Sequence, residues 1–378
     1  MGSSDSAKGA YMAGSHYGRI FKVATWGESH GVAVGAVVDG CPAGLNIDEE
    51  KIQDWLDRRR PGQGKYSTAR NEADKVRILS GVFEGKTEGT PISLLVENSD
   101  ARHKDYDKIK DIYRPGHADF GFDMKYGFRD YRGGGRSSGR ETIGRVAAGA
   151  IAGEFLKELG IGIYAFSRAI GPVAIEDGEI DLEEAMNNPF RLPNKEKARI
   201  ASDFADRMIE EGDSIGGIAE CRISGVPAGI GEPVFDKLDA MLSAGIMSIG
   251  AVKGVEIGEG FNAAALRGSE NNDPFRTEGG RIGKGSNHSG GILGGMSDGG
   301  EIVIRAAFKP TPSIRKRQKS VMRDGEEVDI SIEGRHDPLI VPRALVVVEA
   351  MAALTIADFM LINMSARLNR IKDFYREF

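Results

Sequence analysis

The chain has 378 residues, of which 40% are hydrophobic and 28% charged, shares that are ordinary for a soluble globular protein. Its formal net charge of −6 argues against a general nucleic-acid binder or a protein of anionic membrane surfaces. The 52 glycines show no triplet period, so collagen is excluded and many tight turns are expected.

The ends of the chain and its most apolar stretch bear on domain organisation and location. Residues 1–12 read as an expression tag, and residues 13–378 are expected to form a single domain. We see no signal peptide, which favours a cytoplasmic protein. The apolar stretch 344–364 contains Glu349 and Asp358, so we expect a buried core helix rather than a membrane span. Cys41 and Cys221 lie in no motif and are interpreted as free thiols, although one disulfide stays open.

Hydrophobic periodicity predicts the elements of the first half of the chain. Strands are expected at 20–25 and 32–38, with a Gly-Glu-Ser-His-Gly turn between them, and later at 76–79 and 92–96. A helix is expected at 48–60, with Asp48 as its N-cap and Pro61-Gly62 after its end. Residues 98–135 have little periodicity and are expected to be a functional connection. Ser138 with Glu141 resembles a capping box at the start of a helix that ends at Gly160.

The second half alternates irregularly between strands and helices. One or two strands are expected in 161–173, a polar helical region in 181–212, strands at 215–224, 251–257, 301–308 and 328–332, and helices at 233–247 and 342–364. The segment 259–300 is rich in Gly, Asn and Ser and shows no clear period. Because no βαβ rhythm appears, we predict an α+β fold in one large domain.

Two histidines lie in Gly- and Arg-rich surroundings that suit acid–base chemistry on an anionic ligand. His30 lies in Gly27-Glu28-Ser29-His30-Gly31, and His117 lies in Arg114-Pro115-Gly116-His117-Ala118-Asp119. Imidazole titrates near neutrality, glycine allows close approach of a ligand, and arginine offers a fork for phosphate or carboxylate. A structural histidine is an equal interpretation for His30, whereas for His117 the functional one is favoured.

Arginine clusters are the second chemical signal. The stretch 129–141 carries three glycines, two serines and several arginines before an expected helix start, where unpaired N–H groups bind anions. The stretch 57–65 and the turn 308–313 also present cations, but a solvated helix end and a plain proline turn are open alternatives. We find no zinc spacing, no Walker A loop, no nucleophile elbow and no dinucleotide fingerprint.

These blocks, in this order, closely resemble the chorismate synthase family. They are Gly27–Gly31, Asp57–Gly62, Arg114–Asp119, Asp130–Ser138, Gly290–Gly295 and the run Gly334-Arg335-His336-Asp337-Pro338. The resemblance implies a β-α-β sandwich with helices between antiparallel sheets, assembled as a homotetramer. It also implies 1,4-anti-elimination of phosphate from 5-enolpyruvylshikimate-3-phosphate to give chorismate, with reduced FMN required and no net redox change. Members differ in whether they reduce the flavin with NADPH themselves, and that question stays open.

Site roles carried over by the resemblance fall into three sets. For catalysis it implies that His117 protonates the departing phosphate, that His30 stabilises charge on the reduced flavin, and that Asp337, with Ser29 and Ser137, helps to move the substrate proton. For flavin binding it implies Arg136, Ser137, Ser138, Gly250, Ala251, Gly294, Lys309, Pro310, Thr311, Pro312, Ser313 and Arg335. For substrate binding it implies Arg59, Lys65 and Arg140, with no metal and no nucleic-acid or membrane partner.

Three positions depart from the common family pattern. Lys65 stands where arginine is frequent, Gly139 where alanine is usual, and Gly250 where asparagine is common. Lysine keeps the charge but loses the planar fork. Two other hypotheses stay open: a different flavin- or phosphate-binding enzyme on a related scaffold, and a non-catalytic binder of RNA or phosphorylated ligands. The acidic net charge weighs against the last.

Overall fold

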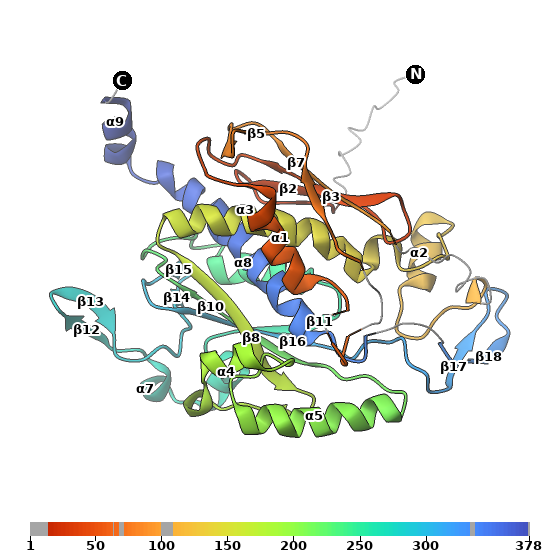
Figure 1. Ribbon diagram of the computed structural model, residues 1–378. Coiled ribbons are helices and arrows are strands. Elements are labelled where there is room, and N and C mark those ends of the chain that lie inside the picture. Colours follow the sequence, from red (N-terminus) through yellow and green to blue (C-terminus); the bar gives the residue numbers. More distant parts are fainter. Residues whose placement is uncertain (1–13, 63, 68–71, 100–108, 333–336, 377–378) are drawn as a thin grey trace, which may run out of the picture.

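The computed structural model describes residues 14–62, 64–67, 72–99, 109–332 and 337–376. Two antiparallel five-stranded sheets enclose a layer of helices, in which α3 and α8 lie at the centre (Figure 1). This arrangement confirms the predicted α+β sandwich. The proposed tag lies outside the described residues.

The first sheet is built from the N-terminal part of the chain. Its strand order is β1-β2-β3-β7-β4, with bounds His16–Tyr17, Lys22–Gly27, Ala33–Asp39, Ile92–Glu97 and Val76–Ile78. The hairpin of β2 and β3 carries the predicted turn with His30 at its bend. Every second residue of β7 is buried, as expected for a strand with one face on a core.

The second sheet is built from the middle of the chain. Its strand order is β11-β16-β10-β8-β9, with bounds Val252–Ile257, Ile302–Phe308, Gly217–Ser224, Gly162–Ile170 and Val173–Ala174. Short hairpins stand outside the two sheets: β5 with β6 (Val82–Phe83, Lys86–Thr87), β12 with β13 (Phe275–Glu278, Arg281–Lys284), β14 with β15 (Ile292–Leu293, Met296–Ser297) and β17 with β18 (Gln318–Val321, Glu327–Ile330).

The central layer consists of α1 (Glu49–Arg59), α3 (Thr142–Glu158), α6 (Leu238–Met247) and α8 (Val341–Ile362). Asp48 caps α1 as predicted, since its side chain accepts from the N–H of Lys51. At the α3–α8 crossing, a Cβ on Gly149 would lie 2.4 Å from the Cβ of Ala350. Only glycine lets the two backbones approach this closely.

Helix α8 is long and apolar enough to cross a membrane, yet most of it is buried between the two sheets. The predicted core helix is therefore confirmed. Its carboxylate Asp358 accepts the backbone N–H groups of Arg19, Ile20 and Phe21 at 2.9, 2.7 and 2.9 Å. These bonds attach the start of the first sheet to the end of the chain.

Several peripheral elements were not predicted individually. Helix α2 (Asp119–Tyr126) lies inside the connection 98–135, and the amphipathic α9 (Leu368–Arg376) follows α8 and projects from the body in Figure 1. The polar region 181–212 forms α4 (Leu182–Asn187) and α5 (Lys195–Glu210) below the second sheet, and α7 spans Gly268–Asn271. Short 3-10 helices lie between these elements in the described residues: η2 (Gly135–Ser137), η3 (Gly139–Glu141), η4 (Asp177–Glu179), η5 (Gly260–Ala265) and η6 (Asn363–Ser365). Both described cysteines are buried and free, as predicted.

Candidate active site

The turn that carries His30 packs directly on the glycine-rich loop before α3. A Cβ on Gly133 would lie 2.8 Å from Nε2 of His30 and 3.1 Å from Oγ of Ser29, so this glycine is required by close approach. Ser29 is buried, and its Oγ has no hydrogen-bond partner among the described residues. The Ser29 hydroxyl is therefore available to bond water or a ligand at this point of the loop.

Arg136 joins the same two segments by another route. Its guanidinium donates to the carbonyl of Gly27 at 3.0 Å and to the carbonyl and hydroxyl of Thr25 at 3.0 and 2.7 Å. These bonds hold the end of β2 against the loop 133–138. Ser137 and Ser138 follow in that loop, where the Ser137 hydroxyl donates to the Gly134 carbonyl at 2.6 Å.

His117 is oriented at both ring nitrogens. Nδ1 lies 2.9 Å from the carbonyl of Pro115, and Nε2 lies 3.0 Å from Oγ of Ser313. Because a carbonyl only accepts, Nδ1 carries a hydrogen, and Nε2 is the nitrogen that gains and loses a proton. The arrangement thus exposes one defined proton site, next to a hydroxyl.

The two histidines belong to neighbouring loops. Arg114, at the start of the His117 loop, donates to the carbonyl of Gly133 at 3.4 Å, and Gly133 touches His30. Arg114 itself is held by a bidentate pair with Asp119 at 2.7 Å. The structure therefore brings the two predicted histidine loops together at Gly133.

The predicted run 309–313 packs against Gly116 in the His117 loop. Nζ of Lys309 donates to the carbonyl of Gly116 at 3.1 Å, and a Cβ on Gly116 would lie 2.6 Å from the Cβ of Pro312. Lys309 also donates its backbone N–H to the carbonyl of Ala251 at 2.9 Å. Burial, and then the charge of Lys253, lower the pKa of Lys309. Because the ammonium groups of Lys309 and Lys253 repel each other, an anion bound between them would be stabilised.

Gly250 and Ala251 supply an open backbone edge beside Lys309. Ala251 has a φ of +72°, which non-glycine residues rarely adopt, while a Cβ on Gly250 would meet no atom within 4 Å. Such strain in a loop concentrates at ligand sites.

Asp337 connects the run 309–313 to helix α8. Its backbone carbonyl accepts from the Thr311 hydroxyl at 2.8 Å, and its carboxylate accepts from Arg343 at 2.5 Å and from Ser67 at 3.4 Å. Arg343 also donates to the carbonyl of Arg59 at 2.9 Å. Sequence reasoning did not include Arg343 or Ser67, because only the fold brings them to Asp337.

Arg59 and Arg140 meet at a shared carboxylate. Asp74 lies 3.3 Å from Nη1 of Arg59 and 3.0 Å from Nη1 of Arg140, and Glu72 also pairs with Arg140. Burial lowers the pKa of Arg59 to about 10 even though Asp74 is adjacent. Nε of Arg59 and Nη2 of Arg140 are buried donors with no hydrogen-bond partner among the described residues. These two spare donors suit an anionic group.

The arginines of 129–145 all have carboxylate partners within the protein, although Arg140 keeps its Nη2 as a spare donor. Arg129 pairs with Asp119 and Asp123, Arg132 with Asp130, and Arg145 with Glu141. Arg136 and Arg140, four positions apart, point to different parts of the fold: Arg136 reaches Thr25 and Gly27, whereas Arg140 reaches Glu72 and Asp74. The partner carboxylates come from distant segments, so the local sequence could not show them.

The expected capping box was also wrong. Ser138 caps only the single turn η3, where it accepts from the N–H of Arg140, and α3 begins at Thr142. The backbone N–H of Glu141 donates to the Ser138 carbonyl at 3.1 Å, but its side chain does not complete the box. Instead, it accepts from the Thr25 hydroxyl at 2.8 Å, which ties α3 to β2.

Three predicted site residues, Gly294, Lys65 and Arg335, are not among those that meet around His30, His117 and Lys309. Gly294, in the β14–β15 turn, adjoins the start of α6 through the bond from Leu238 to Gly295. Gly250 follows the end of that ten-residue helix, so the two lie about 15 Å apart along its axis. Lys65 is largely exposed and pairs with Asp206 at 2.7 Å. Arg335, with His336, lies outside the described residues.

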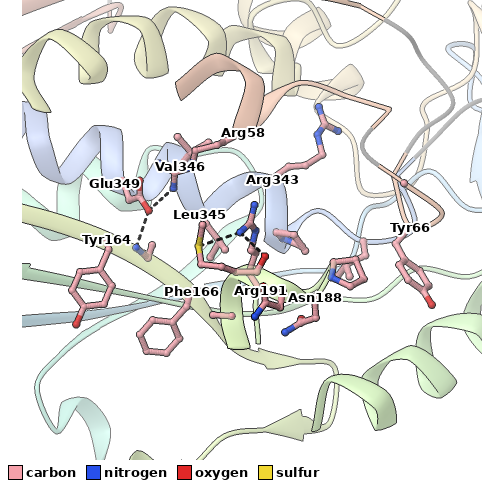
Figure 2. A pocket seen from close by; sticks show the side chains of 18 of the residues that line it. Arg58, Tyr66, Tyr164, Phe166, Asn188, Arg191, Arg343, Leu345, Val346 and Glu349 are labelled. Carbon is pink, nitrogen blue, oxygen red and sulfur yellow. Dashed lines mark hydrogen bonds and ion pairs between the residues drawn. The ribbon is translucent and has the colours of Figure 1, made fainter. Parts of the chain in front are cut away.

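A cavity of about 660 Å³ borders the site behind Asp337. Figure 2 shows α8, with Leu345, Val346 and Glu349, on one side and Arg191 and Asn188 on another. Arg343 lines the cavity and also holds Asp337, so the two spaces share a wall. Within the described segments, no group of three His, Cys, Asp or Glu residues could hold a metal ion.

Comparison with known proteins places this geometry in a family. The family model described as chorismate synthase matches residues 21–361. A relative named chorismate synthase from Lachnospira eligens is 61% identical over 97% of this chain and 100% of its own. One from Chloroflexus aggregans is 55% identical over 95% and 98%, respectively. A crystal structure of chorismate synthase superposes with a TM-score of 0.75 at 32% identity, covering 96% of this chain and 98% of its own. The chain therefore belongs to the chorismate synthase family, whose reaction eliminates phosphate from 5-enolpyruvylshikimate-3-phosphate to give chorismate.

Proposed function

We propose that His117 is the acid of this elimination and that the loops meeting at Gly133 form the flavin and substrate site. The observation that carries this is the orientation of His117 between the Pro115 carbonyl and the Ser313 hydroxyl. A protonated Nε2 beside a hydroxyl can pass its proton to a departing phosphate. The ring needs no reorientation, because Nδ1 is already fixed.

The reaction removes phosphate from one carbon and a proton from the far end of the allylic system, so no net change of oxidation state occurs. The family requires a reduced flavin in general. We assign that cofactor as reduced FMN, which supplies electron density to the allylic system when bound. The remaining work falls to side chains that bind, orient and move protons.

The residues of this chain fit a flavin phosphate and ring. Lys309, with a hydroxyl at Thr311 and another at Ser313, suits the phosphate or an anionic ring edge, and the open backbone at Gly250 and Ala251 admits a flat ligand. Ser138, Pro310 and Pro312 would complete the contacts from the same two loops. His30 is proposed to face the ring, since Gly133 holds it where the two loops meet.

Asp337, Ser29 and Ser137 are proposed to carry the substrate proton. Arg343 neutralises the Asp337 carboxylate at 2.5 Å and fixes its direction. The buried Ser29 hydroxyl lacks a partner among the described residues, which supports a role with a bound ligand. A chain of hydroxyl and carboxylate groups can hand on a proton without bulk water.

Arg59 and Arg140 are proposed to bind the carboxylate groups of the substrate through their spare donors. Asp74 would fix the two guanidinium groups relative to each other. Arg136 would act mainly by holding the loop, because its described donors already reach backbone carbonyls. Lys65 would contact substrate only after leaving Asp206.

Three further assignments rest on the resemblance alone. They are a homotetramer, a cytoplasmic location, and reduction of the flavin either by NADPH on this chain or by an outside source. The resemblance also proposes Gly294 and Arg335 as flavin-binding residues. The acidic net charge supports the absence of a nucleic-acid partner.

An anaerobic assay tests the proposal. The protein is mixed with photoreduced FMN and 5-enolpyruvylshikimate-3-phosphate, without NADPH, and release of phosphate and chorismate is followed. Turnover that survives in His117→Ala would overturn the acid role. The aerobic assay with NADPH then decides whether this chain reduces its own flavin.

A further inference from the structure

The cavity behind Asp337 contains an arginine, Arg191, that forms no salt bridge within the described residues. Among the described residues, Nη1 of Arg191 donates to the carbonyl and the sulfur of Met186, at 3.4 and 3.2 Å. Its φ of +55° is in the left-handed region, which non-glycine residues rarely adopt. A half-buried arginine held in a strained backbone conformation without an acidic partner is a mark of a ligand site.

The other charged groups of the cavity leave its interior positive. Glu349 is neutralised, because its carboxylate accepts from Arg58 at 2.6 Å and from the backbone N–H of Ala165 at 2.8 Å. Arg343 is held by Asp337, and Lys65 by Asp206. Burial, and then the charge of Arg58, lower the pKa of Arg191, and Glu349 offsets them only in part, so an anion beside Arg191 would stabilise its charge.

Most of the remaining lining is apolar or aromatic, and Ser67, Asn187 and Asn188 are its polar members. Tyr164 and Phe166 come from β8, Leu345 and Val346 from α8, and Tyr66 from the loop after α1 (Figure 2). The volume of about 660 Å³ lies within the roughly 300–1,000 Å³ typical of small-molecule sites. A ring fits such walls, and one carboxylate would pair with Arg191 as a bidentate fork.

We propose that this cavity is a binding site for a ring-bearing monocarboxylate, which Arg191 holds by its charged group. The cavity adjoins the proposed substrate site: Arg343 and Ser67 line it and bond Asp337, and Lys65 lies at its rim, held by Asp206, while Arg191 lies on the wall formed after α4. The inference does not rest on the proposed function, since binding is measured without turnover.

The probe is 4-hydroxybenzoate, which carries a ring and a carboxylate but no phosphate, and the matched neutral probe is 4-hydroxybenzamide. Isothermal titration of the full chain is expected to show 1:1 binding of the acid, with the amide at least tenfold weaker. Saturating oxidised FMN and 5-enolpyruvylshikimate-3-phosphate should not displace the acid.

Two variants and one control locate the probe. Arg191→Met removes the charge but keeps an unbranched side chain, and should weaken binding of the acid at least tenfold. Ala185→Leu fills the cavity from α4 without changing a charge and should have the same effect. Arg199→Met removes an exposed arginine of α5 that pairs with Asp203, and should leave binding unchanged.

Three results would overturn the proposal. They are no binding of the acid at millimolar concentration, equal affinity in Arg191→Met and the native chain, or displacement by the substrate. The last would put the probe in the substrate site instead. Loss of turnover in His117→Ala tests the proposed function alone, so the two failures are distinguishable.

Discussion

The hydroxyl of Ser313 lies 3.0 Å from Nε2 of His117, although 196 positions separate the two residues in the chain. This contact unites two motifs that the sequence showed only as separate blocks. Because Nδ1 of His117 is bonded to the Pro115 carbonyl, Nε2 is the ring nitrogen from which His117 can give up a proton.

We expect His117→Ala to bind FMN as well as the native chain but to lose turnover by about 10²–10⁴-fold, the usual contribution of a general acid. Stopped assays with photoreduced FMN measure the rate, and flavin fluorescence measures binding. Ser313→Ala serves as the comparison: it keeps the imidazole and should lose much less. Equal losses in both variants would show that the hydroxyl, and not the ring, is the essential group.

Asp74→Asn should weaken the site and the fold together. The side chain of Asp74 is fully buried between Arg59 and Arg140, and removing one partner of a buried pair costs about 3–5 kcal/mol. Asparagine tolerates the left-handed φ of +45° at this position, so the loss reports on charge. Urea unfolding measures stability, and the KM for substrate should rise more than kcat falls.

Asp206→Asn is the control for that substitution, because it breaks the exposed pair with Lys65. Surface pairs contribute little, so its unfolding midpoint should stay near that of the native chain. If Asp206→Asn lowered the unfolding midpoint strongly and Asp74→Asn did not, the Asp206 carboxylate would stabilise the fold more than the Asp74 carboxylate, contrary to this prediction.

Gly149→Ala should destabilise the helical layer by about 1–3 kcal/mol, as overpacking does. The added Cβ would lie 2.4 Å from the Cβ of Ala350 and 2.6 Å from its Cα, so the backbone of α8 must move. Thermal unfolding measures the change. Gly139→Ala is the matched control, since nothing lies within 4 Å of the Cβ added there, and its melting temperature should be unchanged or slightly higher.

The pair of Arg114 and Asp119 predicts a loss of stability in acid. Burial alone would raise the pKa of Asp119, but hydrogen bonds and charge from Arg114, aided by Arg129, hold it below its usual value. The folded pKa is therefore lower than the unfolded value of roughly 3.9. The stabilisation is present above the unfolded pKa and is lost as the pH falls through the folded one.

Urea midpoints at neutral pH and below pH 4 test this prediction. The native chain should lose more stability between the two conditions than Asp119→Asn, which has no carboxyl to protonate. Parallel pH slopes would mean that another acid dominates, and Asp130, whose pKa the Arg132 pair also lowers, is the next one to replace.

The elements with strong local signals were predictable from the sequence, and the contacts between them were not. Asp48 and Pro61-Gly62 marked both ends of α1, and the two apolar runs around His30 marked the hairpin of β2 and β3. Helix α2 was not predicted because its apolar residues are mostly exposed, so no helical stripe is visible. The homotetramer and the single-domain bounds stay predictions.

The candidate site likewise contains residues that local motifs identified and residues that only the fold brings together. His30 and His117 were found from glycine and arginine in their own motifs. Asp74, Glu72 and Arg343 were missed because an aspartate before a strand, or an arginine in the first turn of a helix, looks ordinary until the fold gives it a partner. A buried guanidinium requires a carboxylate, so each predicted substrate-binding arginine could have prompted a search for an acid elsewhere in the chain.

The three amide bonds that Asp358 accepts tie the segment 19–21 to a helix that is made much later in the chain. During synthesis, β2, β3 and β7 are followed by α3, which packs on all three strands, whereas α8 packs on α3 and on the second sheet. The apolar face of the first sheet can therefore be covered before α8 leaves the ribosome, but the N–H groups of residues 19–21 cannot reach their carboxylate until then. Docking of this segment should be a late folding event, separate in time from formation of the first sheet.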